Sequence, residues 1–349
     1  MNKEKVIITI GLVVTVLLVA TSSYTMAHYP NNNGTLGFIK SFPNAEYEAA
    51  SEEKNNYVIE LTDTNLIIPL RTPLAIIDPI QIPTTFQGTT ENQIIGGEHI
   101  GKSLSSLGDT TTFLRILQIG DSHVRGHYFP LAVRHTLEQC FGSKATFNDK
   151  PLHKNSDCIA TETGKAGVIY SSIGMNGACA SHFAGNDMIR KIAEQRPDIV
   201  IISFGTNESS VDYFESEHTK MMDKLLSRIS ASCPNVKFSL TTPPGSFISK
   251  RSERTYRDKQ GRLRYSYSIV QNENTRRVAQ NIVAYGIKHS IAVWDLYNIS
   301  GGEQYACNNW KNAGLMNKDL IHFTANGYEL QGNLLGEALL KAYNDYVGN

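Results

Sequence analysis

The chain has 349 residues, with 33 basic and 33 acidic side chains, so its formal net charge at pH 7 is zero. This length is sufficient for one or two domains with a full hydrophobic core. The balanced charge argues against a nucleic-acid partner, and we expect none.

Residues 1–27 have the pattern of an export signal. Two lysines precede an uncharged run of fifteen residues, Val6 to Ala20, and small and polar residues follow it. The run is shorter than the roughly twenty residues that span a bilayer, which favours a cleaved signal peptide. An uncleaved signal anchor is the alternative, because Tyr24 and Met26 would extend the apolar segment. Either way we expect an exported protein of the periplasm or cell envelope, in contact with a membrane only through this segment if it is uncleaved.

Residues 28–110 differ in character from the remainder of the chain. They contain scattered prolines and lack helical periodicity. Tyr57 to Leu70 and Leu74 to Ile82 each have the composition of short strands. We therefore predict a tether followed by a strand-rich N-terminal extension.

From residue 111 to residue 349 predicted strands alternate with predicted helices. Five apolar runs predict strands: Phe113 to Gly120, Val168 to Ile173, Ile199 to Ile202, Val236 to Leu240 and Ile291 to Leu296. Apolar residues at helical spacing lie between them, and Gly327 to Tyr343 forms an amphipathic closing segment. This alternation predicts an α/β sandwich with a mostly parallel sheet, in which ligands bind beyond the carboxyl ends of the strands.

The five cysteines fit an oxidising compartment but leave one unpaired. Cys140 and Cys158 flank a polar loop and are the first pair that we expect to form a disulfide. The alternative is that all five are free and partly buried.

Four short motifs follow in order along this second region. Gly120-Asp121-Ser122-His123 comes directly after the first strand, and a Gly174-Met175-Asn176-Gly177 turn follows the second. Gly205-Thr206-Asn207-Glu208 follows the third strand, and Asp319-Leu320-Ile321-His322 precedes the last helix. Each motif alone is weak, but their order and their positions at strand ends make the set specific.

Together these motifs resemble those of the SGNH, or GDSL-like, hydrolase superfamily. The resemblance implies a three-layer α/β/α sandwich with a flavodoxin-like five-stranded sheet over residues 111–349. It also implies that Ser122 is the nucleophile, with His322 as its base and Asp319 as the acid. The oxyanion hole would be formed by Ser122, Gly177 and Asn207.

The chemistry requires these residue types. A serine hydroxyl attacks an ester only when a base accepts its proton, and a carboxylate orients that base. The negative oxygen that develops needs fixed donors, which two backbone N–H groups and an amide supply. No cofactor and no metal are needed. His123 and His127 are four residues apart, but no acidic residue lies between them as in a zinc-binding His-Glu-x-x-His motif.

Two further features concern the substrate. His123, beside the nucleophile, is expected to form a wall of the site, and Trp310 to stack on a sugar ring or to anchor its loop. Residues 250–264 carry seven basic side chains, which predicts a solvated hairpin around Gln260-Gly261 or an insertion that contacts an anionic glycan.

We therefore expect an exported serine esterase that removes acetyl groups from a carbohydrate. The Gly-Asp-Ser-His and Gly-Thr-Asn-Glu motifs resemble the branch with peptidoglycan O-acetylesterases, so an acetylated glycan such as peptidoglycan is the favoured partner. An O-acetyltransferase, a lipase or a thioesterase would use the same residues. A non-catalytic glycan-binding protein of the envelope is the alternative from another class.

Overall fold

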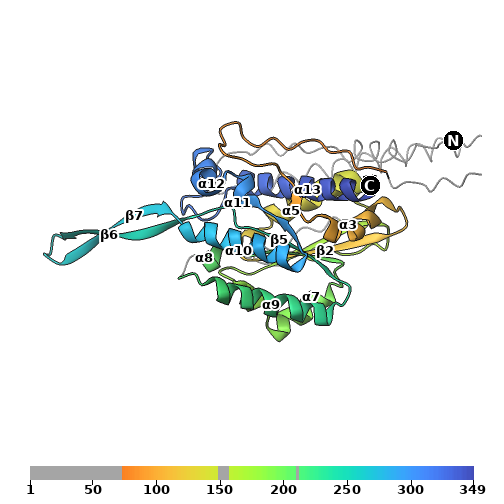
Figure 1. Cartoon of the computed structure of the whole chain (residues 1–349), viewed down its shortest axis with the longest axis horizontal. Coiled ribbons are helices and arrows are strands. Elements are labelled where there is room, and N and C mark those ends of the chain that lie inside the picture. The colour runs from red at the N-terminus through yellow and green to blue at the C-terminus, as the bar shows by residue number, and fades with distance from the viewer. Residues whose placement is uncertain (1–72, 148–156, 210–211) are drawn as a thin grey trace, which may run out of the picture. The chain divides into compact units, whose positions relative to one another are not determined.

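The computed structural model describes residues 73–147, 157–209 and 212–349 (Figure 1). In this part of the chain six strands form the central sheet, in the order β1-β8-β5-β4-β2-β3. Their bounds are Ile94–Ile95 (β1), Phe113–Gly120 (β2), Gly167–Gly174 (β3), Ile199–Ser203 (β4), Lys237–Thr241 (β5) and Ala292–Trp294 (β8). Five strands are parallel, and β1 pairs antiparallel with β8. The predicted α/β sandwich is confirmed, with one short edge strand added.

The strand register sets the position of the loops that carry the motifs. In β2, Gly120 pairs with Gly174 of β3 on one side and with Ser203 of β4 on the other. The three strands therefore end at the same level. The loops that follow them start side by side at the carboxyl edge of the sheet, where ligands of α/β sheets bind.

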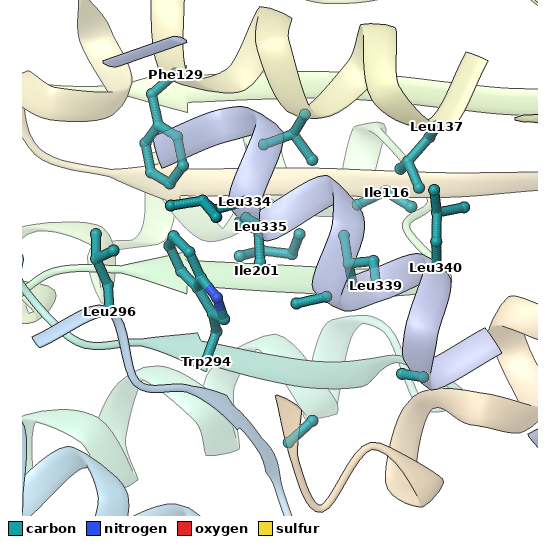
Figure 2. Packing of buried hydrophobic residues seen from close by; sticks show 14 of the residues in the cluster. Ile116, Phe129, Leu137, Ile201, Trp294, Leu296, Leu334, Leu335, Leu339 and Leu340 are labelled. Carbon is teal, nitrogen blue, oxygen red and sulfur yellow. The ribbon is translucent and has the colours of Figure 1, made fainter. Parts of the chain in front are cut away.

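Helices cover both faces of the sheet because residues of each strand alternate between two cores. Ile116 and Ile201 point to a core shared with α5 (Tyr128–Phe141) and α13 (Ala325–Gly348), as Figure 2 shows. Leu117 and Val200 point to the opposite core, which is completed by helices α7, α9 and α10. These three helices span Asn186–Glu194, Glu215–Ser232 and Glu273–His289.

Close packing of α13 on α5 depends on two glycines. A Cβ added at Gly332 would lie 2.4 Å from the Phe129 oxygen, and one at Gly336 would lie 2.5 Å from the Thr136 Cβ. Larger residues would therefore force the helices apart. The shorter helices are α3 (Glu98–Leu104), α4 (Ser122–Arg125), α6 (Ala180–Phe183), α8 (Thr206–Ser209), α11 (Leu296–Ile299), α12 (Gly302–Asn312) and the 3₁₀ turn η1 (Ser105–Gly108).

Strands β6 (Phe247–Arg257) and β7 (Leu263–Gln271) form a separate antiparallel pair. This hairpin extends away from the sandwich (Figure 1). The sequence prediction of a hairpin turning at Gln260-Gly261 is confirmed, and Gly261 has the positive φ of +75° that such turns favour.

The predicted strand over Leu74 to Ile82 is wrong. The segment forms no strand, because its backbone is bonded to side chains of α13. The Ala75 N–H donates to Asn344 Oδ1 at 2.7 Å, and the Ile80 N–H donates to Glu337 Oε2 at 3.1 Å. The described part of the extension thus contains the two-residue strand β1, which pairs with β8, followed by the helix α3 and the 3₁₀ turn η1, which pack against α13. The predicted strand over Tyr57 to Leu70 lies outside the described residues.

The predicted disulfide between Cys140 and Cys158 is also wrong. All five cysteines are described, and no disulfide joins any two of them. Cys140 at the end of α5 donates through Sγ to the Ile76 oxygen at 3.1 Å. Cys158 pairs through its backbone with Ser172 of β3. The two residues are therefore fixed by different parts of the structure.

None of the helices in the described ranges has the length and apolar character needed to cross a membrane. The predicted signal peptide or anchor, residues 1–27, lies outside those ranges.

Candidate active site

Two short hydrogen bonds join the three predicted triad residues into a chain. His322 Nε2 lies 2.8 Å from Ser122 Oγ, and His322 Nδ1 lies 2.7 Å from Asp319 Oδ2. Residues 200 positions apart in the sequence thus meet at the carboxyl edge of the sheet. The spacing suits proton transfer from the serine to the imidazole, with the carboxylate holding the ring.

Ser122 is positioned by the sharp turn from β2 into α4. A Cβ added at Gly120 would lie 2.4 Å from Val124 Cγ2 and 2.5 Å from the Ser203 oxygen. Only glycine therefore allows β4 and α4 to approach this turn so closely. Asp121 then caps α4, since its Oδ1 accepts the His123 N–H at 2.9 Å.

Asp121 is buried and has an unusual protonation state. Burial raises its pKa to about 8, so the carboxyl group is protonated at neutral pH. Asp121 therefore adds no negative charge next to Ser122 at that pH, and Asp319 is the carboxylate that contacts His322.

The loop that carries the acid and the base is built around Asp319. Its Oδ1 accepts the N–H groups of Ile321 and His322, both at 3.0 Å, while its Oδ2 faces the imidazole. Partial burial would raise the Asp319 pKa, but these hydrogen bonds outweigh it and hold the pKa below its ordinary value. Leu320, which lies between Asp319 and Ile321, adopts a left-handed φ of +56°. This conformation is strained for a leucine, and the surrounding hydrogen bonds hold it.

The predicted oxyanion residues lie on the two loops next to Ser122. Gly177 is exposed in the turn after β3 and has a φ of +71°, which favours glycine there. Asn207 follows β4, and its Nδ2 donates to the Ala178 oxygen at 2.9 Å and lies 3.4 Å from Asp121 Oδ2. Asn207 thus bridges the nucleophile loop and the Gly177 loop.

The sequence did not identify the residue that joins these loops. Glu208 is buried, and its Oε1 accepts the Ala180 N–H at 2.9 Å while its Oε2 accepts the Gly205 N–H at 3.0 Å. Burial raises the pKa of Glu208 despite these bonds. The motif placed an acidic residue beside Asn207, but only the structure shows that it fastens the loops after β3 and β4 together.

A family model described as the GDSL-like Lipase/Acylhydrolase family matches residues 119–330. The chain belongs to this family. It is therefore an SGNH/GDSL hydrolase, an enzyme that hydrolyses esters, and the matched range includes all four motifs. No match was found among curated protein sequences.

Solved structures that are similar to this chain include several esterases. A peptidoglycan O-acetylesterase has 18% identity and a TM-score of 0.54, covering 73% of this chain and 99% of its own. A carbohydrate esterase family 3 member from Talaromyces cellulolyticus has 16% identity and a TM-score of 0.43, covering 67% of this chain and 99% of its own. An acetyl esterase has 15% identity and a TM-score of 0.42, with coverage of 67% and 99%.

In this hydrolase His123 lies beside the base rather than open to solvent. It is 6% exposed, and its ring centroid lies 5.3 Å from that of His322. Its Nδ1 lies 3.0 Å from the hydroxyl of Tyr328 on α13, a partner that the sequence did not reveal. Burial lowers the His123 pKa to about 3, so the ring stays neutral at physiological pH. In the structure the His123 ring supports the His322 ring. Little of the His123 side chain is accessible to a substrate.

Trp310 is not available to the substrate of the hydrolase. It lies on α12, is fully buried, and makes edge-on contacts with Phe86 and Phe323 at centroid distances of 5.1 and 5.2 Å. The prediction of sugar stacking is therefore wrong, and the alternative of a packing anchor is correct. Its large apolar ring packs in the hydrophobic core to which α12 and α13 both contribute.

His127 is buried at the start of α5. Within the ranges that the structure describes, no three His, Cys, Asp or Glu residues cluster in a way that could hold a metal ion.

Proposed function

We propose that this hydrolase is an exported serine esterase that removes acetyl groups from a carbohydrate, with peptidoglycan as the favoured substrate. The hydrogen-bonded chain from Asp319 through His322 to Ser122 carries the proposal. Three observations support the choice of peptidoglycan as the substrate and the expectation of export. The fold is shared with a peptidoglycan O-acetylesterase, the Gly-Asp-Ser-His motif resembles that branch, and residues 1–27 have the pattern of an export signal.

In the proposed reaction Ser122 Oγ attacks the ester carbonyl carbon while its proton passes to His322 Nε2. The negative oxygen of the tetrahedral intermediate is stabilised by the N–H groups of Ser122 and Gly177 and by the Asn207 amide. The intermediate collapses, and the sugar oxygen leaves with the proton from His322. A water molecule then gives its proton to His322 and attacks the acetyl-serine, which releases acetate and restores the hydroxyl of Ser122.

The first test is hydrolysis of p-nitrophenyl acetate by the wild type and by Ser122→Ala. The variant should lose about 10⁵-fold or more in kcat, because the nucleophile is gone. Ser181→Ala, which alters an exposed serine on α6, is the matched control and should retain activity. Equal rates for the wild type and Ser122→Ala would rule out the mechanism and favour a non-catalytic role.

The second test concerns the substrate. Acetate release is compared between O-acetylated peptidoglycan and acetylated xylan, with a free sugar acceptor present or absent. We expect faster release from peptidoglycan. Faster release from xylan would indicate that the substrate is a glycan other than peptidoglycan. Acetyl transfer to the added sugar would identify an acetyltransferase.

A further inference from the structure

The β6–β7 hairpin is strongly basic, although the whole chain is neutral. Residues 247–271 contain seven lysine or arginine residues and two acidic residues, a net charge of +5. Asp258, one of the acidic residues, already accepts hydrogen bonds from Arg262 Nε and Arg264 Nε, both at 3.0 Å. The hairpin therefore presents an excess of positive charge to whatever approaches it.

One face of the hairpin also carries a row of large exposed side chains. Side chains of a strand alternate between faces, so the residues at positions 263, 265, 267 and 269 of β7 share one face. Their exposed fractions are 54% for Leu263, 38% for Tyr265, 64% for Tyr267 and 63% for Ile269. At about 3.4 Å per residue the row is roughly 20 Å long, which suits an extended ligand better than a single small one.

Cations stand next to the aromatic rings on this same face. Arg251 pairs with Tyr267 across the hairpin, and its guanidinium lies 3.1 Å from the centroid of the Tyr265 ring. Arg257 pairs with Leu263 farther along. A surface that alternates tyrosine rings with arginines offers faces for stacking on sugar rings and donors for carboxylates.

The base of the hairpin is bonded to the loop that carries the acid and the base. The Phe247 N–H, at the start of β6, donates to the Leu320 oxygen at 3.0 Å. Leu320 directly follows Asp319, and two residues later comes His322. A polymer that lies along the hairpin therefore runs toward the loop that contacts Ser122.

We propose that the β6–β7 hairpin binds a negatively charged, acetylated polysaccharide and extends substrate contact beyond the ester at Ser122. This inference rests on the proposed function, because it treats the ligand of the hairpin as the polymer that bears the ester. A second copy of the chain is a poorer occupant, since pairing two hairpins would bring two charges of +5 together. A lipid bilayer is poorer too, because tyrosine and arginine outnumber aliphatic side chains on this face.

The test compares Tyr267→Ala and Arg251→Ser with the wild type on three substrates: p-nitrophenyl acetate, acetylated polygalacturonate, which is anionic, and acetylated glucomannan, which is neutral. The readout is kcat/KM on each polymer divided by kcat/KM on p-nitrophenyl acetate. We expect the polygalacturonate ratio to fall at least fivefold in each variant, and the glucomannan ratio to fall less in Arg251→Ser. Ser268→Ala, on the opposite face of β7, is the matched control and should keep both ratios.

A binding measurement separates this inference from the proposed function. The Ser122→Ala chain should be retarded by polygalacturonate in affinity electrophoresis, less so at high salt, and Tyr267→Ala should remove most of the retardation. If the wild type hydrolyses no ester, the proposed function fails, and the retardation still decides the role of the hairpin. Unchanged ratios, unchanged retardation, hairpin-dependent dimers or hairpin-dependent binding to anionic vesicles would each overturn the inference.

Discussion

The two halves of the active site are held in different ways. The half that carries Ser122 and Asn207 is fastened by buried carboxyl groups, Asp121 and Glu208, which accept backbone N–H groups from three loops. The half that carries Asp319 and His322 is a partly exposed loop, with side-chain exposures of 47% and 37%. Changes in the exposed half should therefore remove chemistry with little loss of stability, whereas changes in the buried half should affect both.

The largest effect is expected from the exposed half. His322→Ala removes the base and should lower kcat on p-nitrophenyl acetate by about 10⁵-fold or more, while Asp319→Asn should cost about 10⁴-fold. Because both side chains are partly exposed, the melting temperature of each variant should stay within about 2 °C of the wild type. Steady-state kinetics and thermal unfolding measure the two quantities. A variant that keeps a tenth of the activity would exclude the triad assignment.

Asn207→Ala comes next. Loss of one oxyanion donor should lower kcat by about 10²- to 10³-fold with a smaller change in KM, because the amide acts on the charge of the transition state. The variant also loses the bond to the Ala178 oxygen, so some loss of stability is expected. Asn186→Ala on α7, away from the site, is a control. An unchanged kcat would remove Asn207 from the oxyanion hole.

Glu208→Gln tests whether the buried half of the active site depends on both side-chain oxygens of Glu208. A glutamine offers one oxygen and one N–H₂ group, so it can accept only one of the N–H groups of Ala180 and Gly205. The buried group left without an acceptor should lower the free energy of unfolding by about 1–3 kcal/mol, which is several degrees in melting temperature. Glu217→Gln, an exposed position on α9, is the control. Equal melting temperatures would mean that Glu208 does not hold the loops together.

The pH dependence of stability should also report on the buried half. The Asp121 pKa is about 8 in the folded protein against an ordinary value of 3.8. Between about pH 4 and pH 8 the folded protein therefore keeps a proton that the unfolded chain has released, and this contribution to stability falls as pH rises through that window. Asp121→Asn has no titrating carboxyl group at this position, so its melting temperature should fall less steeply from pH 5 to pH 8 than that of the wild type. Parallel curves for the two proteins would contradict the raised pKa.

Strands and motifs that a short segment of sequence determines could be predicted, whereas contacts between residues far apart in the sequence could not. Ile199 to Ile202 predicted its strand because buried parallel strands are continuously apolar, and Phe113 to Gly120 predicted its strand from a mostly apolar run that contains Arg115 and Gln118. The four motifs placed Ser122, Asn207 and His322 at strand ends or before the last helix, and the structure brings Ser122 and His322 into contact.

The errors share a physical cause. The fate of Leu74 to Ile82 depended on side chains of α13 more than 250 residues away, which offered its backbone better partners than another strand did. Trp310 packs in the core against Phe86 and Phe323, and the sequence, which allowed either a sugar contact or an anchor, did not distinguish between these two roles. The sequence showed Glu208 only as the last residue of the Gly-Thr-Asn-Glu motif. Its partner Gly205 is in the same motif, but its partner Ala180 lies on the loop after β3, so no local pattern could assign the bond that joins the two loops.

Tyr328 is another partner that only the fold supplies, and it leads to the smallest predicted effect. Its hydroxyl lies 3.0 Å from His123 Nδ1, and the His123 ring packs beside His322. Tyr328→Phe would leave that buried nitrogen without a partner, at a cost of about 1 kcal/mol. If the loss appears in the positioning of the base, kcat should fall about fivefold while KM changes little, because a displaced imidazole slows the chemical step and leaves substrate binding intact. Tyr346→Phe, on the same helix and partly exposed, should change neither. A lower melting temperature with an unchanged kcat would show that Tyr328 serves packing alone, and that the exposed half of the site needs no support from the buried one.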